Sequence, residues 1–201
     1  MRIRIYLTVM IMLLSIPVVA RAIDQDTLDR MTFLLQQFEY TAWDEGIFDD
    51  TTLYEGLEQI YSDSKRDGND ILAAKALWAM GVTGIELFAP TLISAIDDEP
   101  IAVCYALGNL ESTDGVDALI GKLDDEDMQI RDAAVVGLGN IPWTKDLDES
   151  KQDAIKALNA RFAVEKEAWV KDDINAAIVF IETGVAISPT FADSEPEGMA
   201  H

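Results

Sequence analysis

Hydrophobic residues recur with the spacing of an α-helix through most of the chain after residue 22. The clearest run places apolar or small residues on one helical face at Ile130, Ala133, Ala134, Gly137, Leu138 and Ile141. Residues three, four and seven positions apart share a face of a helix, whereas a half-buried strand alternates at every second residue. The same helical register recurs over residues 73–80 and 103–110. The sequence therefore predicts helices there.

The predicted helices recur at a regular interval. They align on Leu77, Leu107, Leu138 and Ile178, which are separated by 30, 31 and 40 residues. Each of the first two of these helices is followed by a segment with a shorter apolar face, at 85–96 and at 116–123. Each of these segments ends in an acidic turn, at 97–99 and at 124–126. Two helices in each unit of about 30 residues are typical of a helical solenoid.

We therefore expect an all-α fold, namely a right-handed α-solenoid of antiparallel helix pairs with about 8–10 helices. The last repeat is stretched by residues 142–150, which we interpret as a loop insertion. Four segments follow from the pattern: a cleaved signal peptide at 1–22, an N-terminal capping helical pair at 23–68, the repeats at 69–183, and a disordered acidic tail at 184–201.

The capping pair is predicted from two apolar faces ahead of the repeats. The first begins at Leu28, and Asp26 or Thr27 could cap its helix. The second begins at Leu53, and its helix could start at Thr51 or Thr52. Such residues favour helix N-termini because their side-chain oxygens accept hydrogen bonds from free backbone N–H groups.

The repeats resemble a known family. The segments ALGNLESTDGVDALIGKLDDED (106–127) and QIRDAAVVGLGNI (129–141) are similar to the HEAT-like repeats described in phycobilin lyases. The resemblance is strongest over residues 103–141 and weaker over 69–98 and 152–183. It implies that Arg131 meets an Asp of an inter-repeat turn. It also implies that Lys171 occupies the matching structural position in the last repeat.

The first 22 residues predict export. Arg2 and Arg4 precede an uncharged run from residue 5 to residue 20, and small residues precede a cleavage point after Ala22. The alternative is a membrane anchor, but a spanning helix needs about 20 apolar residues. We expect a periplasmic or extracellular protein with no stable membrane anchor after cleavage. Cleavage removes three basic residues and no acidic one, so the exported chain is more acidic than its precursor.

Charge and composition exclude several classes of protein. The chain has 37 acidic and 15 basic residues and a net charge of −22, so nucleic acid is a poor partner and a basic protein surface is a better one. Its single cysteine, Cys104, and single histidine, His201, cannot form an intramolecular disulfide or a Cys/His zinc site. Cys104 lies in an apolar helical stretch, where we expect it to be buried and inert.

No catalytic, cofactor-binding or metal-binding residue is predicted. Residues 63–69 match part of a calcium loop, but Lys65 and Ala74 occupy positions that need oxygen ligands. Helix capping explains the acidic turns. Their loose association with divalent cations stays open as an alternative.

Candidate contact residues come from the insertion and an acidic turn. Insertions in solenoids map to loops, often on the binding face, so we expect Trp143 to contact a partner. The alternative, held equal, is that Trp143 packs back over the neighbouring helix end. Acidic residues of the turn before Arg131 complete the predicted contact set: Asp124, Asp125 and Glu126. Trp78 and Trp169 are predicted to be partly buried packing residues.

The sequence thus favours an exported, non-enzymatic repeat protein that mediates protein–protein interaction as a scaffold or adaptor. An accessory lyase or chaperone for a tetrapyrrole-type ligand is the alternative that the resemblance implies. The predicted export and the lack of a suitable histidine or exposed cysteine count against it. A third interpretation is that the acidity serves solubility in a salty habitat.

Overall fold

The computed structural model describes residues 23–37, 48–110, 112–143 and 148–184, and the signal-peptide prediction and almost all of the predicted tail lie outside them. This part of the chain is all-α and contains no strand. Its nine α-helices are α2 (Gln25–Gln37), α4 (Asp50–Asp67), α5 (Asp70–Val82), α6 (Ala89–Ala95), α7 (Pro100–Asn109), α8 (Val116–Lys122), α9 (Met128–Asn140), α10 (Asp148–Val164) and α11 (Ala168–Thr183). Two 3₁₀ turns, η1 (Glu86–Phe88) and η2 (Thr113–Gly115), precede α6 and α8.

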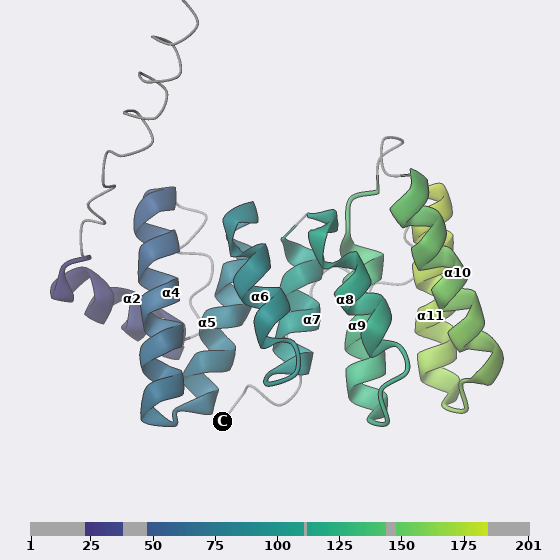
Figure 1. Cartoon of the computed structure of the whole chain (residues 1–201), viewed down its shortest axis with the longest axis horizontal. Helices are drawn as coiled ribbons and strands as arrows, with labels where there is room; N and C mark the ends of the chain where they lie inside the picture. Colours follow the sequence, from purple (N-terminus) through teal and green to yellow (C-terminus); the bar gives the residue numbers. More distant parts are fainter. Residues whose placement is uncertain (1–22, 38–47, 111, 144–147, 185–201) are drawn as a thin grey trace, which may run out of the picture.

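The helices stand side by side in a row from α2 to α11 (Figure 1). One layer consists of α5, α7, α9 and α11, and each of these helices packs against the next. The second layer contains α6, α8 and α10, which pack against α7, α9 and α11 respectively. At the N-terminal end, α2 and α4 pack against each other and against α5.

The core follows the apolar faces that the sequence predicts. Leu77, Leu107 and Leu138 occupy equivalent places in α5, α7 and α9, and all three are buried. Ile178 in α11 is only partly buried, because α11 is the last described helix of its layer. Burying one such side chain stabilises the fold by roughly 1.5–3 kcal/mol.

Glycine lets two helices of the first layer approach closely. A Cβ atom added to Gly137 of α9 would lie 2.5 Å from the carbonyl oxygen of Cys104 in α7. A Cβ atom on Gly108 of α7 would lie 2.7 Å from the Cα atom of Gly137. Both positions therefore exclude larger residues, as the repeat pattern suggests, because a side chain would push the two backbones apart.

The structure corrects the predicted starts of both N-terminal helices. Asp24, rather than Asp26 or Thr27, caps α2: its Oδ1 accepts the N–H of Thr27 at 3.0 Å. Asp49 caps α4 by accepting the N–H of Thr52 at 2.9 Å, one residue before the helix begins. In both helices the cap precedes the first apolar residue by a full turn, because it must reach an N–H group three residues ahead.

The predicted loop insertion is shorter than expected. It ends before Asp148, where α10 begins, so residues 148–150 are helical. Most of the calcium-like stretch belongs to the last turn of α4, and Gly68 ends that helix with a φ of 71°. The carboxylates of Asp63 and Asp67 both pair with Arg66 on the surface of this helix.

Candidate functional site

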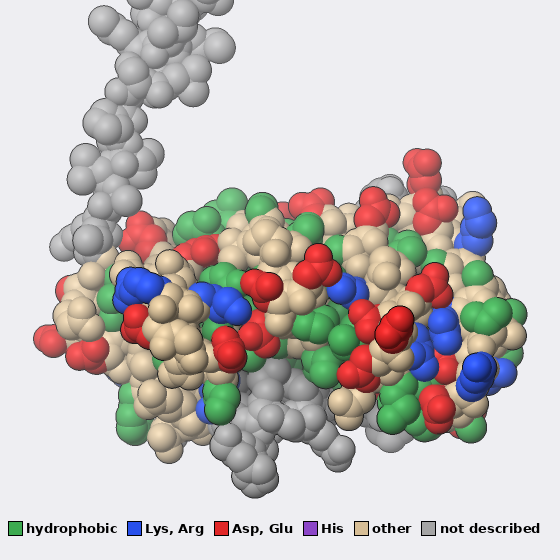
Figure 2. Space-filling model, turned by 60° about the horizontal axis from the view of Figure 1, so that its bottom comes forward, with side chains coloured by type: hydrophobic (Ala, Val, Ile, Leu, Met, Phe, Trp, Pro, Cys, Tyr) green, Lys and Arg blue, Asp and Glu red, His purple; other side chains and the backbone are tan. Residues whose placement is uncertain are grey.

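The helical hairpin at the C-terminal end of the row carries the most concentrated exposed apolar surface. In this hairpin α10 packs against α8, and α11 packs against α9. Phe162, Val164 and Trp169 flank the turn between the two helices and are 41%, 61% and 42% exposed. We call these three residues the hairpin patch. Figure 2 shows hydrophobic and basic side chains interspersed at this end of the molecule.

Large exposed hydrophobic residues elsewhere in the described part of the chain are scattered. They belong to four different elements: Phe33, Ile71, Leu87 and Met128. Isolated exposed apolar residues are normal on proteins, whereas a cluster marks a site of contact. The three residues of the hairpin patch lie within an eight-residue segment, which sets this end apart.

The two tryptophans predicted to be partly buried packing residues differ in exposure. Trp78 is 8% exposed and meets the ring of Tyr105 edge-on at 5.6 Å between centroids. Trp169, near the start of α11, is 42% exposed, so its side chain is only partly covered and far more accessible than that of Trp78.

Lys171 belongs to the same hairpin. Its Nζ atom lies 5.4 Å from the centroid of the Phe162 ring, a cation–π contact between α11 and α10. The resemblance placed Lys171 among the residues that join one repeat to the next. In the units that the sequence predicts, α11 begins the last repeat and α10 belongs to the repeat before it, so this contact lies between two of the predicted units.

A buried ion pair attaches the hairpin turn to α9. Arg131 donates from Nε and Nη2 to the two carboxylate oxygens of Glu165, at 2.8 and 3.0 Å. Arg131 also donates from Nη1 to the backbone carbonyls of Asp125 and Glu126, both at 3.0 Å. Arg131 is 8% exposed and Glu165 is 3% exposed. One guanidinium therefore joins the acidic turn before α9 to the turn between α10 and α11.

Glu165 is surrounded by donors. Its carboxylate also accepts hydrogen bonds from Arg161 and from the backbone N–H groups of Lys166 and Glu167. The Arg131 guanidinium is the main cause that holds the pKa of Glu165 far below its usual range, and burial opposes it only in part. Glu165 is therefore a charged structural group across the physiological pH range.

The predicted inter-repeat role of Arg131 is present, but with another partner. The resemblance implied an Asp of an inter-repeat turn, whereas the turn before α9 contributes only backbone carbonyls to Arg131. The carboxylate comes from Glu165, which the sequence analysis did not single out. Its spacing of four residues from Arg161 was the available signal, since side chains four positions apart meet on a helix.

The structure separates the predicted contact residues. Trp143 follows the C-terminal end of α9, whereas Asp124, Asp125 and Glu126 precede its N-terminal end. A helix of 13 residues places these two groups about 20 Å apart. They do not form one surface.

Trp143 packs back over the helix end, which was the alternative interpretation. Its Nε1 donates to the carbonyl oxygen of Leu138 at 2.9 Å, and its ring lies against the core. Among the acidic residues, Asp124 pairs with Arg161 at 3.3 Å, and an Asp125 oxygen accepts the N–H of Asp127. Glu126 is exposed. The turn therefore has internal structural roles, as does Asp127, whose side chain caps α9.

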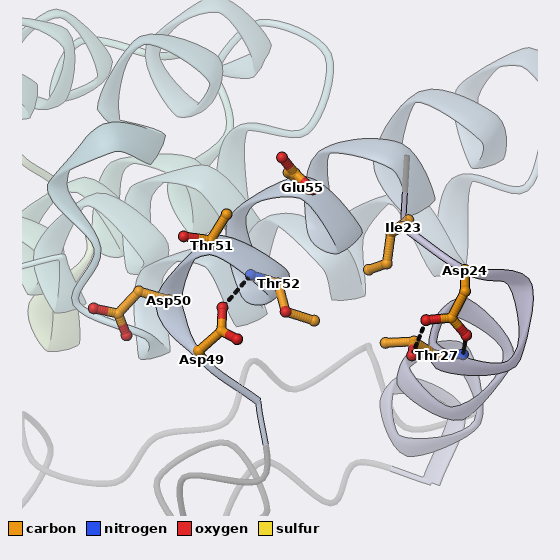
Figure 3. Close-up of a pocket in the computed structure, with 8 residues that line it drawn as sticks. All are labelled: Ile23, Asp24, Thr27, Asp49, Asp50, Thr51, Thr52 and Glu55. Atoms are coloured by element: carbon orange, nitrogen blue, oxygen red, sulfur yellow. Dashed lines mark hydrogen bonds between the residues drawn. The ribbon is translucent and has the colours of Figure 1, made fainter. Parts of the chain in front are cut away.

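A pocket of about 870 Å³ lies between the N-terminal ends of α2 and α4 (Figure 3). Its carboxylates include the two caps Asp24 and Asp49, which bond to Thr27 and Thr52. Backbone hydrogen bonds lower the pKa of both aspartates. The polar groups of this pocket thus terminate helices, and nothing in their geometry points to a reaction.

Other candidate chemistry is limited in the part of the chain that is described. No group of three or more His, Cys, Asp or Glu residues there is arranged to hold a metal ion. Cys104 is buried, as predicted, and burial raises the pKa of its thiol to about 12, which keeps it unreactive. None of the described helices has the length and apolar character to cross a membrane.

Comparison with family models, with curated proteins and with solved structures found no match for this chain. The resemblance to HEAT-like repeats therefore stays a prediction. What the structure establishes is the class: an all-α protein of packed neighbouring helices, with three large apolar residues exposed near the turn between α10 and α11.

Proposed function

We propose that this chain is an exported, non-enzymatic protein that binds another protein through the hairpin patch. The observation that carries the proposal is the exposure of Phe162, Val164 and Trp169, which lie within eight residues of one another where α10 ends and α11 begins. Export rests on the composition of residues 1–22. The binding role rests on the patch, because soluble proteins rarely leave several large apolar side chains clustered in water without a use for them.

We also propose that the helices form a right-handed α-solenoid of HEAT-like repeats. Two regularities support this finer description. Leu77, Leu107 and Leu138 take equivalent buried positions in α5, α7 and α9, and each helix of the first layer packs against the next helix of that layer. In such arrays a terminal repeat lacks a neighbour on its outer side, so it must be polar there or be covered by something else.

The local charges indicate what the partner looks like. Lys166 and Lys171 lie among Glu167 and Asp172, so the turn is balanced in charge although the chain as a whole is strongly acidic. A partner at this end therefore needs an apolar surface with mixed charges around it, and it need not be basic. A basic partner stays the prediction for contacts through the acidic turns.

The test is a capture experiment with matched variants. The chain without residues 1–22 serves as bait in material from the compartment to which it is exported. We expect Trp169→Ala to weaken capture of a specific protein at least tenfold, since exposed aromatic residues dominate interface energies. Leu87→Ala, at a residue that is 68% exposed on η1, is the control and should capture that protein as the wild type does.

Two results would count against the proposal. In the first, Trp169→Ala captures the same protein as well as the wild type. In the second, every protein that the wild-type bait captures is captured in the same amount by the Trp169→Ala bait. Circular dichroism of both variants shows whether each keeps the helical fold, so that a loss of binding reports on the surface.

A further inference from the structure

Two carboxyl groups face each other where α9 meets α11. Asp132 lies on α9 and Asp173 on α11, and a hydrogen bond joins their side chains. The Oδ1 atom of Asp132 is buried and has no hydrogen-bond partner. Two carboxylates are both acceptors, so a hydrogen bond between them requires a proton on one of the two groups.

No basic residue of the described helices is among the charges that act on this pair, and this includes Lys151 and Lys156 of α10. Arg131 on α9 binds Glu165, Lys171 on α11 lies over Phe162, and Arg161 on α10 binds Glu165 and Asp124. On α8, Lys122 pairs with Asp97, and α7 contains no charged residue. The further charged group that acts on the pair is Asp172, whose negative charge disfavours ionisation of Asp173.

We propose that Asp132 and Asp173 share one proton at the contact between α9 and α11, and that release of this proton to solvent loosens the α10–α11 hairpin from the rest of the molecule. When the proton is present, the two carboxyl groups are joined by a hydrogen bond inside the interface. Without it, two negative charges face each other in a region that water reaches poorly, where repulsion is stronger than in water. This inference is independent of the proposed function.

The direction of the pH effect follows from the protonation of Asp132. Burial, aided by the facing Asp173, raises the pKa of Asp132 from 3.8 to about 7. Between these two values the folded state holds a proton that the unfolded chain has lost. Stability therefore falls as the pH rises from about 4 to about 7, and it levels off above that range.

The experiment measures unfolding by urea between pH 5 and pH 8.5 for the wild type and for Asp132→Asn. An asparagine donates to Asp173 at every pH, so it imitates the protonated pair. We expect the folding equilibrium constant of the wild type to fall at least tenfold relative to that of the variant across this range. Asp172→Asn is the matched control at an exposed neighbouring position and should keep most of the wild-type pH dependence.

Two further measurements separate the parts of the proposal. Carbon-13 NMR of the aspartate carboxyl groups should show a titration near pH 7 in the wild type that is lost in Asp132→Asn. Hydrogen exchange, corrected for intrinsic rates, should increase between pH 5 and pH 7 in α11 and much less in α5. If Asp132→Asn fails to fold, Asp173→Asn removes the same pair from α11.

If the folding equilibrium constant depends on pH equally in the wild type, in Asp132→Asn and in Asp173→Asn, the two aspartates do not share a proton. The same conclusion follows if every aspartate carboxyl group titrates in the usual acidic range. An equal increase of exchange in α5 and α11 would overturn the loosening of the hairpin, because it would show that the whole molecule opens as one unit.

Discussion

At the scale of single residues, Arg131 is the polar group with the largest structural consequence. Its guanidinium donates to one carboxylate and two backbone carbonyls, and these acceptors come from two separate turns. A buried charge with all its partners costs little, but the same charge without its partner costs several kcal/mol. The ion pair therefore matters less for total stability than for keeping the hairpin turn in one place.

Glu165→Gln tests this assignment. The variant leaves the Arg131 charge buried without its counter-ion, so we expect a loss of about 3–5 kcal/mol in the free energy of unfolding at pH 7. Because the folded-state pKa of Glu165 is lowered, its contribution is present above the unfolded value near 4.5 and decreases as the pH falls below it. Urea denaturation at pH 7 and at pH 3.5 measures both effects.

Glu167→Gln is the control for this substitution. Glu167 lies in the same turn and is exposed, so its variant should remain within about 0.5 kcal/mol of the wild type. If Glu165→Gln behaves like Glu167→Gln at pH 7, the buried pair does not hold the turn.

Gly137→Ala tests the close contact between α7 and α9. The added methyl group would collide with the backbone carbonyl of Cys104, which cannot move as a flexible side chain can. We expect a loss of about 1–3 kcal/mol or more in the free energy of unfolding, measured by thermal or urea denaturation. Gly121→Ala is the matched control, since a Cβ atom there meets nothing within 4 Å and alanine should stabilise the helix by roughly 0.5–1 kcal/mol. Equal effects at the two positions would contradict the packing assignment.

At the scale of elements, most of the fold could be predicted from periodicity. The buried residues of α5, α7 and α9 lie on the faces that the leucine spacing predicts, because each of these helices packs against its neighbours through the same apolar positions. The sequence prediction placed the caps of α2 and α4 too late, because an aspartate or threonine shortly after Asp24 and Asp49 also satisfies the preference for a capping residue. The site was harder to predict, because Trp169 and Trp78 both lie at helical spacing, yet Trp169 is 42% exposed and Trp78 is 8% exposed.

The end of α9 offers a test of the role of Trp143. Its indole N–H satisfies the Leu138 carbonyl, one of the last carbonyls of α9, which have few partners inside the helix. Trp143→Phe keeps the ring and removes this donor, so we expect a loss of about 1 kcal/mol in stability and no change in partner binding. The free energy of unfolding and the affinity for the captured partner check this. A large loss of affinity with unchanged stability would restore Trp143 as a contact residue.

At the scale of the whole molecule, part of the acidity has internal explanations. Asp24, Asp49 and Asp127 cap helices, and Asp97 and Asp124 pair with Lys122 and Arg161. The exposed remainder still gives the chain its net charge of −22, which disfavours nucleic acid and favours solubility. The hairpin patch differs from this surface in being apolar and balanced in charge.

This difference predicts the salt dependence of binding. Contacts through the hairpin patch should change less than threefold in affinity between 50 mM and 500 mM salt, because burial of apolar surface dominates them. Contacts between the acidic turns and a basic partner should weaken much more over the same range, since exposed charges are screened. The affinity of the captured protein, measured by calorimetry at both salt concentrations, decides which surface it uses.

The central claim, that the hairpin patch is the binding surface, is tested most directly by site-specific photo-crosslinking in the native compartment. A photoreactive amino acid replaces Val164 in the patch or, as the control, Leu87 on η1, and the two positions are similarly exposed. We predict one discrete crosslinked protein from position 164, lost when Trp169→Ala is added, and no corresponding product from position 87. Equal products from both positions, or none from position 164, would contradict the account.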